Sequence, residues 1–117
     1  MTDTVTIYHN PRCSKSRATL ELLGAQGIQP RVIEYLDTPP DAATLDQLLE
    51  LLGLEPRALL RTREAEYRAA GLDNPACTRE QLITAMVQYP ILIERPIVVC
   101  GGKAAIGRPP EKVLEII

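Results

Sequence analysis

Aromatic residues are scarce in this chain of 117 residues, which has no tryptophan, no phenylalanine and four tyrosines. Because apolar residues still make up 45% of the chain, its core must be built almost wholly from aliphatic side chains. The formal net charge is only −2, so no global field draws the chain to nucleic acid or to an anionic membrane. Any anion site must therefore be a local group of cations.

Long hydrophobic runs are absent as well. No stretch approaches the roughly 18 apolar residues of a membrane span. The N-terminus, MTDTVTIYHN, carries an aspartate and lacks the basic segment that begins a signal peptide. We therefore expect a cytoplasmic protein without a membrane partner, forming a single domain over residues 1–117 that is large enough to bury a core without disulfides or a metal.

Cysteine and histidine are too few and too scattered for a structural framework. The chain has three cysteines, Cys13, Cys77 and Cys100, and one histidine, His9. No CxxC or CxxH pair is present, so the pattern argues against both a disulfide framework and a metal site. Free thiols are the expected state in a reducing cytosol.

The first 36 residues alternate between strand and helix patterns. TVTIY at 4–8 and RVIEYL at 31–36 predict strands, because β-branched and aromatic residues alternate in them. Between them a helix is predicted from Ser14, with Gly27 as its C-cap. Its expected apolar stripe is Ala18, Leu22 and Ala25, beside Leu20 and Leu23. A helix that joins two strands predicts a parallel βαβ unit.

Residues 41–88 carry only helix patterns. Asp41 or Thr44 is the expected cap of the leucine-rich helix that follows. EPRALLRTREAEYRAAGL predicts one or two short helices with a break near Arg61–Thr62. Thr78 and Gln81 have the spacing of a capping box at the start of another helix. This part of the chain is therefore predicted to be an all-helical insertion.

The last 22 residues return to strand patterns before a final helix. PIVVC, GGK and AAI predict a β-hairpin, and PPEKVLEII predicts a helix that opens with proline. The whole order predicts an α/β fold of thioredoxin-like topology. It comprises a four-stranded mixed sheet flanked by helices, with the helical insertion at about 41–88.

Cys13 is predicted to lie in a loop directly before a helix. Backbone N–H groups there lack helical partners, and the helix dipole favours an anion, so a thiol at this place ionises more readily. Cations and hydroxyl groups flank it in the sequence, namely Arg12, Ser14, Lys15, Ser16 and Arg17. Such neighbours favour a nucleophilic thiolate over the main alternative, an inert buried cysteine.

The other sulfur and imidazole groups have less specific interpretations. The loop reads Cys-Ser-Lys-Ser, so a disulfide at Cys13 would need Cys77, Cys100 or an outside thiol to release it. Cys100 ends an apolar strand, which favours a place in the core, whereas Cys77 lies in a polar loop. His9 either polarises the loop or the thiol, or is a surface residue at the end of a strand.

Several segments together resemble a known family. TIYHNPRCSKSR, YLDTPP, RALLRTREAEYRAAGL, YPILIERPIVV and GRPPEKVLEI resemble the glutaredoxin-dependent arsenate reductases of the ArsC/Spx group over essentially the whole chain. The resemblance implies reduction of arsenate to arsenite in a thioredoxin-like, ArsC-type domain. It also implies glutathione as co-substrate, glutaredoxin as partner, and no bound metal or prosthetic group.

The resemblance also assigns roles to residues. Cys13 matches the nucleophile, and the arginines that bind the oxyanion are matched by Arg61, Arg95 and Arg108. His9 and Ser16 match supporting positions in the catalytic loop, and Pro96 matches the cis-proline of thioredoxin-like folds. A guanidinium is a permanently charged planar fork suited to tetrahedral oxyanions, although surface salt bridges are the usual fate of an arginine.

Two alternatives remain within the same group. An Spx-type transcriptional regulator that binds RNA polymerase typically has a CxxC switch in this loop, and Ser16 at the second position counts against it. A thioredoxin-fold protein with glutathione-linked thiol chemistry can keep the cysteine while losing part of the arginine set. Because all the matching arginines are present here, arsenate reduction is the favoured prediction.

Overall fold

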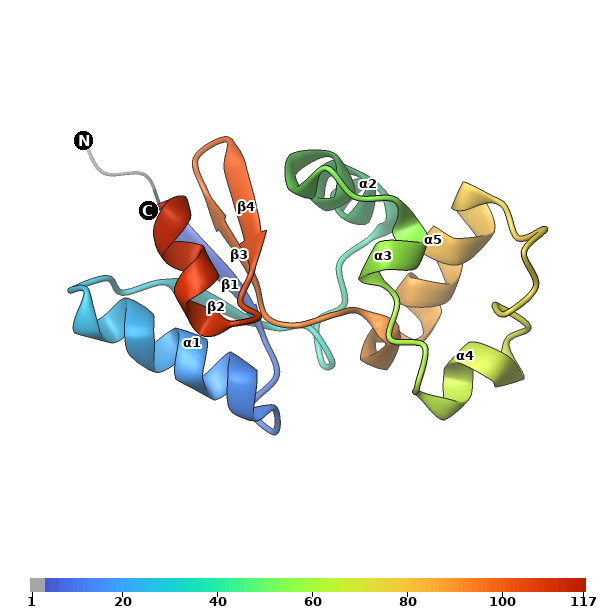
Figure 1. The fold of residues 1–117 in the computed structure, drawn as a ribbon, viewed down its shortest axis with the longest axis horizontal. Helices are drawn as coiled ribbons and strands as arrows, with labels where there is room; N and C mark the ends of the chain where they lie inside the picture. Colours follow the sequence, from blue (N-terminus) through green and yellow to red (C-terminus); the bar gives the residue numbers. More distant parts are fainter. Residues whose placement is uncertain (1–3) are drawn as a thin grey trace. The chain divides into compact units, whose positions relative to one another are not determined.

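The computed structural model describes residues 4–117, which divide into two compact units (Figure 1). The first unit comprises the described residues up to Thr38 together with Arg95–Ile117, and the second unit comprises Pro39–Glu94. None of the helices in the described part of the chain is long and apolar enough to cross a membrane.

The first unit is built on a four-stranded mixed sheet with strand order β2-β1-β3-β4. Its strands are β1 (Val5–His9), β2 (Arg31–Glu34), β3 (Ile97–Cys100) and β4 (Lys103–Ile106). β1 and β2 are parallel, whereas β1–β3 and β3–β4 are antiparallel. The predicted α/β fold with its βαβ unit and C-terminal hairpin is therefore confirmed, although β2 ends two residues before the predicted strand.

Helix α1 (Ser14–Ala25) and the 3-10 helix η2 (Pro110–Glu115) pack against each other beside the sheet (Figure 1). The core between these helices and the sheet is aliphatic, as the scarcity of aromatic residues requires. It consists of Val5, Ile7, Leu23, Val98 and Val113. In the final helix Val113 is buried, whereas Leu114 is exposed, and Ile116, directly after the helix, packs partly buried against the core. Apolar contacts of Val113 and Ile116 therefore hold this short helix against the core.

The buried face of α1 differs from the predicted stripe. Ser16, Thr19 and Leu23 are the buried residues, whereas Ala18 and Ala25 are exposed. The prediction failed because two of the buried residues are polar. Their hydroxyl groups have hydrogen-bond partners inside the unit, which removes most of the cost of burying them.

The second unit contains only helices, in agreement with the pattern of its sequence. They are α2 (Ala42–Leu52), α3 (Pro56–Leu59), α4 (Ala65–Ala69), α5 (Arg79–Gln88) and the 3-10 helix η1 (Pro90–Leu92). Asp41 caps α2 through Thr44, and Thr78 and Gln81 form the predicted capping box of α5. Local capping signals therefore placed these helix starts correctly.

Candidate active site

Cys13 is the N-cap of α1, at the junction that the sequence predicts. Its backbone is extended (φ −95°, ψ 123°), and its N–H donates to the carbonyl of Asn10 at 3.0 Å, which closes the loop through Pro11. The thiol is half-buried and lies beside the first turn of the helix. A sulfur at this place faces backbone N–H groups that no helical carbonyl can satisfy.

The surroundings of the thiol lower the pKa of Cys13. Burial acts to raise this pKa, but it is outweighed by hydrogen bonds from the Ser16 backbone, the Arg95 side chain and the Lys15 backbone, and by the charge of Arg95. The thiolate is therefore favoured by helix-start amides together with a guanidinium. This combination is typical of reactive rather than structural cysteines.

Two of the predicted arginines lie at this sulfur. Arg95, directly after the helical segment, is buried (9% exposed) and reaches the thiol with its side chain. Nη2 of Arg108 lies 3.6 Å from the Cys13 Sγ, and its Nε donates to the carbonyl of Arg95 at 2.8 Å. The two guanidinium groups thus converge beside the thiolate, as an oxyanion site requires.

His9 and Ser16 form a buried hydrogen-bonded pair beneath the loop. Nδ1 of His9 lies 2.6 Å from Oγ of Ser16, and the same hydroxyl accepts from the N–H of Asn10 at 3.0 Å. Burial lowers the pKa of His9. The negative charge of Glu34 opposes this effect, whereas the positive charge of Arg17 adds to it. The alternative of a surface histidine is wrong, because His9 is only 6% exposed. Through the Ser16 hydroxyl, the pair holds the backbone of the loop.

Arg61 belongs to the second unit and is engaged with two carboxylates. Its guanidinium lies 2.8 Å from Glu94 and 3.3 Å from Glu64, and its backbone N–H donates to the carbonyl of Leu92 at 2.7 Å. Burial acts to lower the pKa of Arg61, but these carboxylates outweigh it and raise the pKa. Its predicted role as an oxyanion ligand stays a prediction.

The remaining cysteines, Cys77 and Cys100, are free thiols in the described part of the chain. Cys100 pairs with Val5 in the sheet, at the opposite end of β1 from His9, and packs against the core. Cys77 belongs to the second unit, where its Sγ lies 3.5 Å from the carbonyl oxygen of Gly71. Within the first unit, Cys100 is therefore not placed to resolve a disulfide at Cys13.

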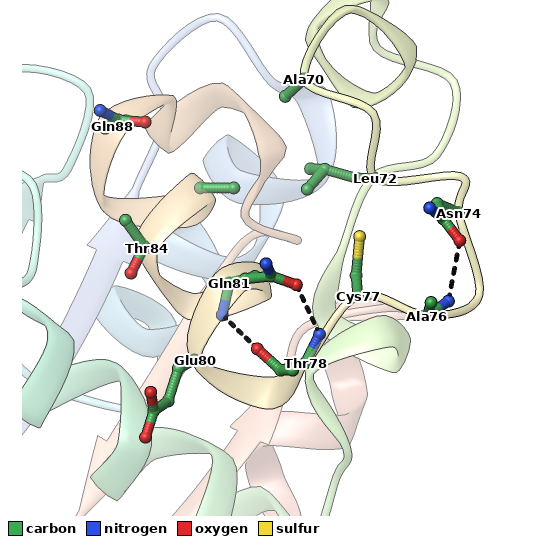
Figure 2. Close-up of a pocket in the computed structure, with 11 residues that line it drawn as sticks. Ala70, Leu72, Asn74, Ala76, Cys77, Thr78, Glu80, Gln81, Thr84 and Gln88 are labelled. Atoms are coloured by element: carbon green, nitrogen blue, oxygen red, sulfur yellow. Dashed lines mark hydrogen bonds between the residues drawn. The ribbon is translucent and has the colours of Figure 1, made fainter.

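A pocket of about 730 Å³ in the second unit differs from the Cys13 site in that no cationic side chain lines it (Figure 2). Cys77 and Leu72 line it together with small and uncharged polar side chains, and Glu80 is its one ionisable carboxylate. The reciprocal hydrogen bonds of Thr78 and Gln81 form part of its wall (Figure 2). It contains no cation for an oxyanion. Within residues 4–117, no cluster of three histidine, cysteine or acidic side chains could hold a metal ion.

The sequence marked Asn10 only as a turn former beside Pro11, and it did not single out Thr19 or Gly107. Asn10 uses its carbonyl, N–H and side chain to fix the loop, with Oδ1 accepting from the Arg12 N–H at 3.0 Å. Thr19 and Gly107 meet beside the arginine segments. The Asn-Pro pair is the turn signal that predicts a loop at Asn10, whereas nothing local to Thr19 marks its contact with Gly107. The predicted cis peptide bond before Pro96 is present.

Comparison with known proteins agrees with this geometry. Residues 8–116 match the ArsC family. A protein of Escherichia coli (strain K12) named "Uncharacterized protein YfgD" is 57% identical over 118 residues, covering 100% of this chain and 99% of that protein. An arsenate reductase of Neisseria meningitidis serogroup A is 46% identical over 114 residues, covering 97% of each chain. The structure of an arsenate reductase from Vibrio cholerae is similar, with a TM-score of 0.97 and 52% identity over 100% of both chains.

The chain is therefore a member of the ArsC family with a thioredoxin-like fold. The predicted family is confirmed. A thiolate at a helix start, with two guanidinium groups beside it, is the site that this member presents.

Proposed function

We propose that this protein is an arsenate reductase that acts in the cytoplasm through a Cys13 thiolate. The observation that carries the proposal is the convergence of Arg95 and Arg108 on a cysteine whose pKa is lowered. An oxyanion bound by these guanidinium groups would lie in contact with the nucleophile. Relatives 46% identical to this chain bear the name arsenate reductase.

In the first step, arsenate binds to Arg95 and Arg108, with Arg61 as the third ligand implied by the family resemblance. The Cys13 thiolate then attacks arsenic, a sulfur–arsenic bond forms, and one arsenate oxygen leaves as water after protonation. The guanidinium groups and the free N–H groups of the helix start stabilise the negative charge on the remaining oxygens. Arsenic is still As(V) at this stage.

The second step needs two electrons, and two external thiols supply them. Glutathione forms a bond to arsenic and displaces one arsenic oxygen as water; a glutaredoxin thiol then attacks the glutathione sulfur, forming a mixed disulfide and leaving the electron pair of the sulfur–arsenic bond on arsenic. Arsenic is thereby reduced to As(III), and hydrolysis of the Cys13–arsenic bond releases arsenite. This scheme fits the loop because Ser16 occupies the place of a resolving cysteine and its hydroxyl is already bonded to His9.

A second candidate is glutathione-linked thiol chemistry without arsenate. The specific observation that favours it is the pairing of Arg61 with Glu64 and Glu94, which neutralises one of the arginines implied to bind the oxyanion. The Arg95–Arg108 pair would then serve to stabilise the thiolate and the carboxylates of a peptide thiol.

A coupled assay with arsenate, glutathione, glutaredoxin and an NADPH-regenerating system separates the two candidates. We expect turnover that disappears in Cys13→Ser, falls sharply in Arg95→Ala and persists in the matched control Cys77→Ser. Full turnover in Cys13→Ser would contradict the mechanism. No turnover in the unmodified protein, with the glutaredoxin shown to be active, would favour the thiol chemistry alone.

A further inference from the structure

Gly107 lies where the segment that carries Arg108 approaches α1 closely. A Cβ atom at position 107 would lie 2.5 Å from Oγ1 of Thr19 and 2.8 Å from Cγ of Pro96. Real Cβ atoms essentially never approach other atoms within 3.0 Å. Gly107 is buried, so a side chain there could not turn out to solvent without moving one of these neighbours.

Thr19 is held firmly on the helix side of this contact. It is fully buried on α1, and its hydroxyl donates to the carbonyl of Lys15 at 2.8 Å. The N–H of Lys15 is itself one of the groups that stabilise the Cys13 thiolate. The surface that Gly107 meets is therefore part of the helix turns that support the nucleophile.

On the other side of the contact, the two arginine segments are tied together. The N–H of Gly107 donates to the carbonyl of Pro96 at 3.0 Å, and Nε of Arg108 donates to the carbonyl of Arg95 at 2.8 Å. A displacement at position 107 is consequently transmitted to both guanidinium groups. Because Cys13 lies at the start of α1, the contact between Gly107 and Thr19 sets the distance of the two guanidinium groups from the Cys13 sulfur.

We propose that Gly107 is a positioning residue of the anion site. Its lack of a side chain lets the Arg95 and Arg108 guanidinium groups approach the Cys13 sulfur closely, which stabilises the thiolate and keeps the site fitted to a small tetrahedral oxyanion. This inference deepens the proposed function, but it holds for any tetrahedral oxyanion bound at this place.

The test uses Gly107→Ala in the full chain, with Cys77 and Cys100 replaced by serine so that a single thiol is observed. The pKa of Cys13 is followed by thiolate ultraviolet absorbance, and anion binding by the protection that inorganic phosphate gives against iodoacetamide. We expect a higher pKa and at least about tenfold weaker protection, the size of a lost charge-assisted hydrogen bond. Neither measurement needs turnover, so failure of arsenate reduction would not be confused with failure of this proposal.

Gly102→Ala is the matched control. Gly102 lies in the β3–β4 turn, and a Cβ there would meet nothing within 4 Å, so both measurements should be unchanged. Thr19→Ala in the Gly107→Ala chain removes the contact at 2.5 Å and should restore part of the phosphate protection. An unchanged pKa and unchanged protection in folded Gly107→Ala would overturn the proposal.

If Gly107→Ala alone does not fold, the comparison of Thr19→Ala with Thr19→Ala/Gly107→Ala carries the test. In the double variant the new Cβ still meets Cγ of Pro96 at 2.8 Å. Weaker phosphate protection in the double variant than in Thr19→Ala supports the positioning role. Equal protection and equal pKa in the two variants overturn it.

Discussion

The guanidinium of Arg108 lies 3.6 Å from the sulfur of Cys13, although 95 positions separate the two residues in the sequence. The side chain of Arg95 also forms a hydrogen bond with the sulfur, and the carbonyl of Arg95 accepts a hydrogen bond from Nε of Arg108. The sheet makes the meeting possible, because β1 leads into the Cys13 loop while its neighbour β3 begins directly after the Arg95–Pro96 pair.

Arg95→Ala should slow the reaction of Cys13 at neutral pH. Arg95 contributes both a hydrogen bond and a positive charge that lower the pKa of the thiol, so its removal raises this pKa. The pH profile of iodoacetamide alkylation should shift to higher pH, since only the thiolate reacts. Arg79→Ala is the control. Arg79 lies in the second unit, forms an ion pair with Asp46 and is not among the groups that lower the pKa of Cys13. An unshifted profile in Arg95→Ala would contradict the assignment.

Ser16→Ala should destabilise the protein and loosen the catalytic loop. The buried hydroxyl is bonded to Nδ1 of His9 and accepts from the Asn10 N–H, so its loss leaves buried polar groups unsatisfied. We expect a loss of about 1–3 kcal/mol in the free energy of unfolding, measured by urea denaturation. Ser14→Ala is the matched control, because Ser14 is exposed on the same helix turn. Equal stability of the two variants would argue against the loop-holding role.

His9 should make stability fall on mild acidification. Burial lowers its pKa in the folded state, so the unfolded chain binds the proton more readily. The stabilisation is complete above the unfolded pKa of about 6.5 and is lost as pH falls toward the lower folded value. His9→Gln should show a weaker loss of unfolding free energy between about pH 7 and pH 5. A parallel loss in both proteins would exclude His9 as the cause.

The exposed cations around Cys13 should favour anionic reaction partners. Arg12 and Lys15 are exposed beside the thiol, and their backbone is fixed by the loop and by α1. Cys13 should react faster with an anionic aromatic disulfide than its pKa predicts, and added salt should slow this reaction because screening weakens the attraction. A neutral disulfide is the control. Lys15→Ala should reduce the salt dependence, and an unchanged dependence would show that Lys15 takes no part.

Local sequence signals predicted most of the elements and the place of Cys13 at a helix start. The Thr78–Gln81 capping box, the Asp41 cap and the turn at Asn10–Pro11 each act within a few residues, so they can be recognised without the fold. The same is true of Cys13, because its place at a helix start depends only on the loop and on the helix that follows.

The sequence did not predict which side chains pair with one another, even at residues that it singled out. The pattern of α1 suggested an alanine and leucine stripe, whereas the folded unit buries Ser16 and Thr19 because partners for their hydroxyl groups come from the loop and the helix backbone. Arg61 matched the anion-binding arginines, yet its neighbours Glu64 and Glu94 engage it. Such pairings depend on which groups meet in space.

The sequence by itself thus determined the order of helices and strands, the aliphatic core and a cysteine at a helix start, because each follows from local periodicity, capping and composition. The tertiary structure alone decided that Arg95 and Arg108 meet at the Cys13 sulfur and that Gly107 contacts Thr19. Those relationships arise when β3 pairs with β1 and brings the end of the chain against α1. A hydrogen bond or a steric contact across such a distance in sequence exists only once the sheet has formed.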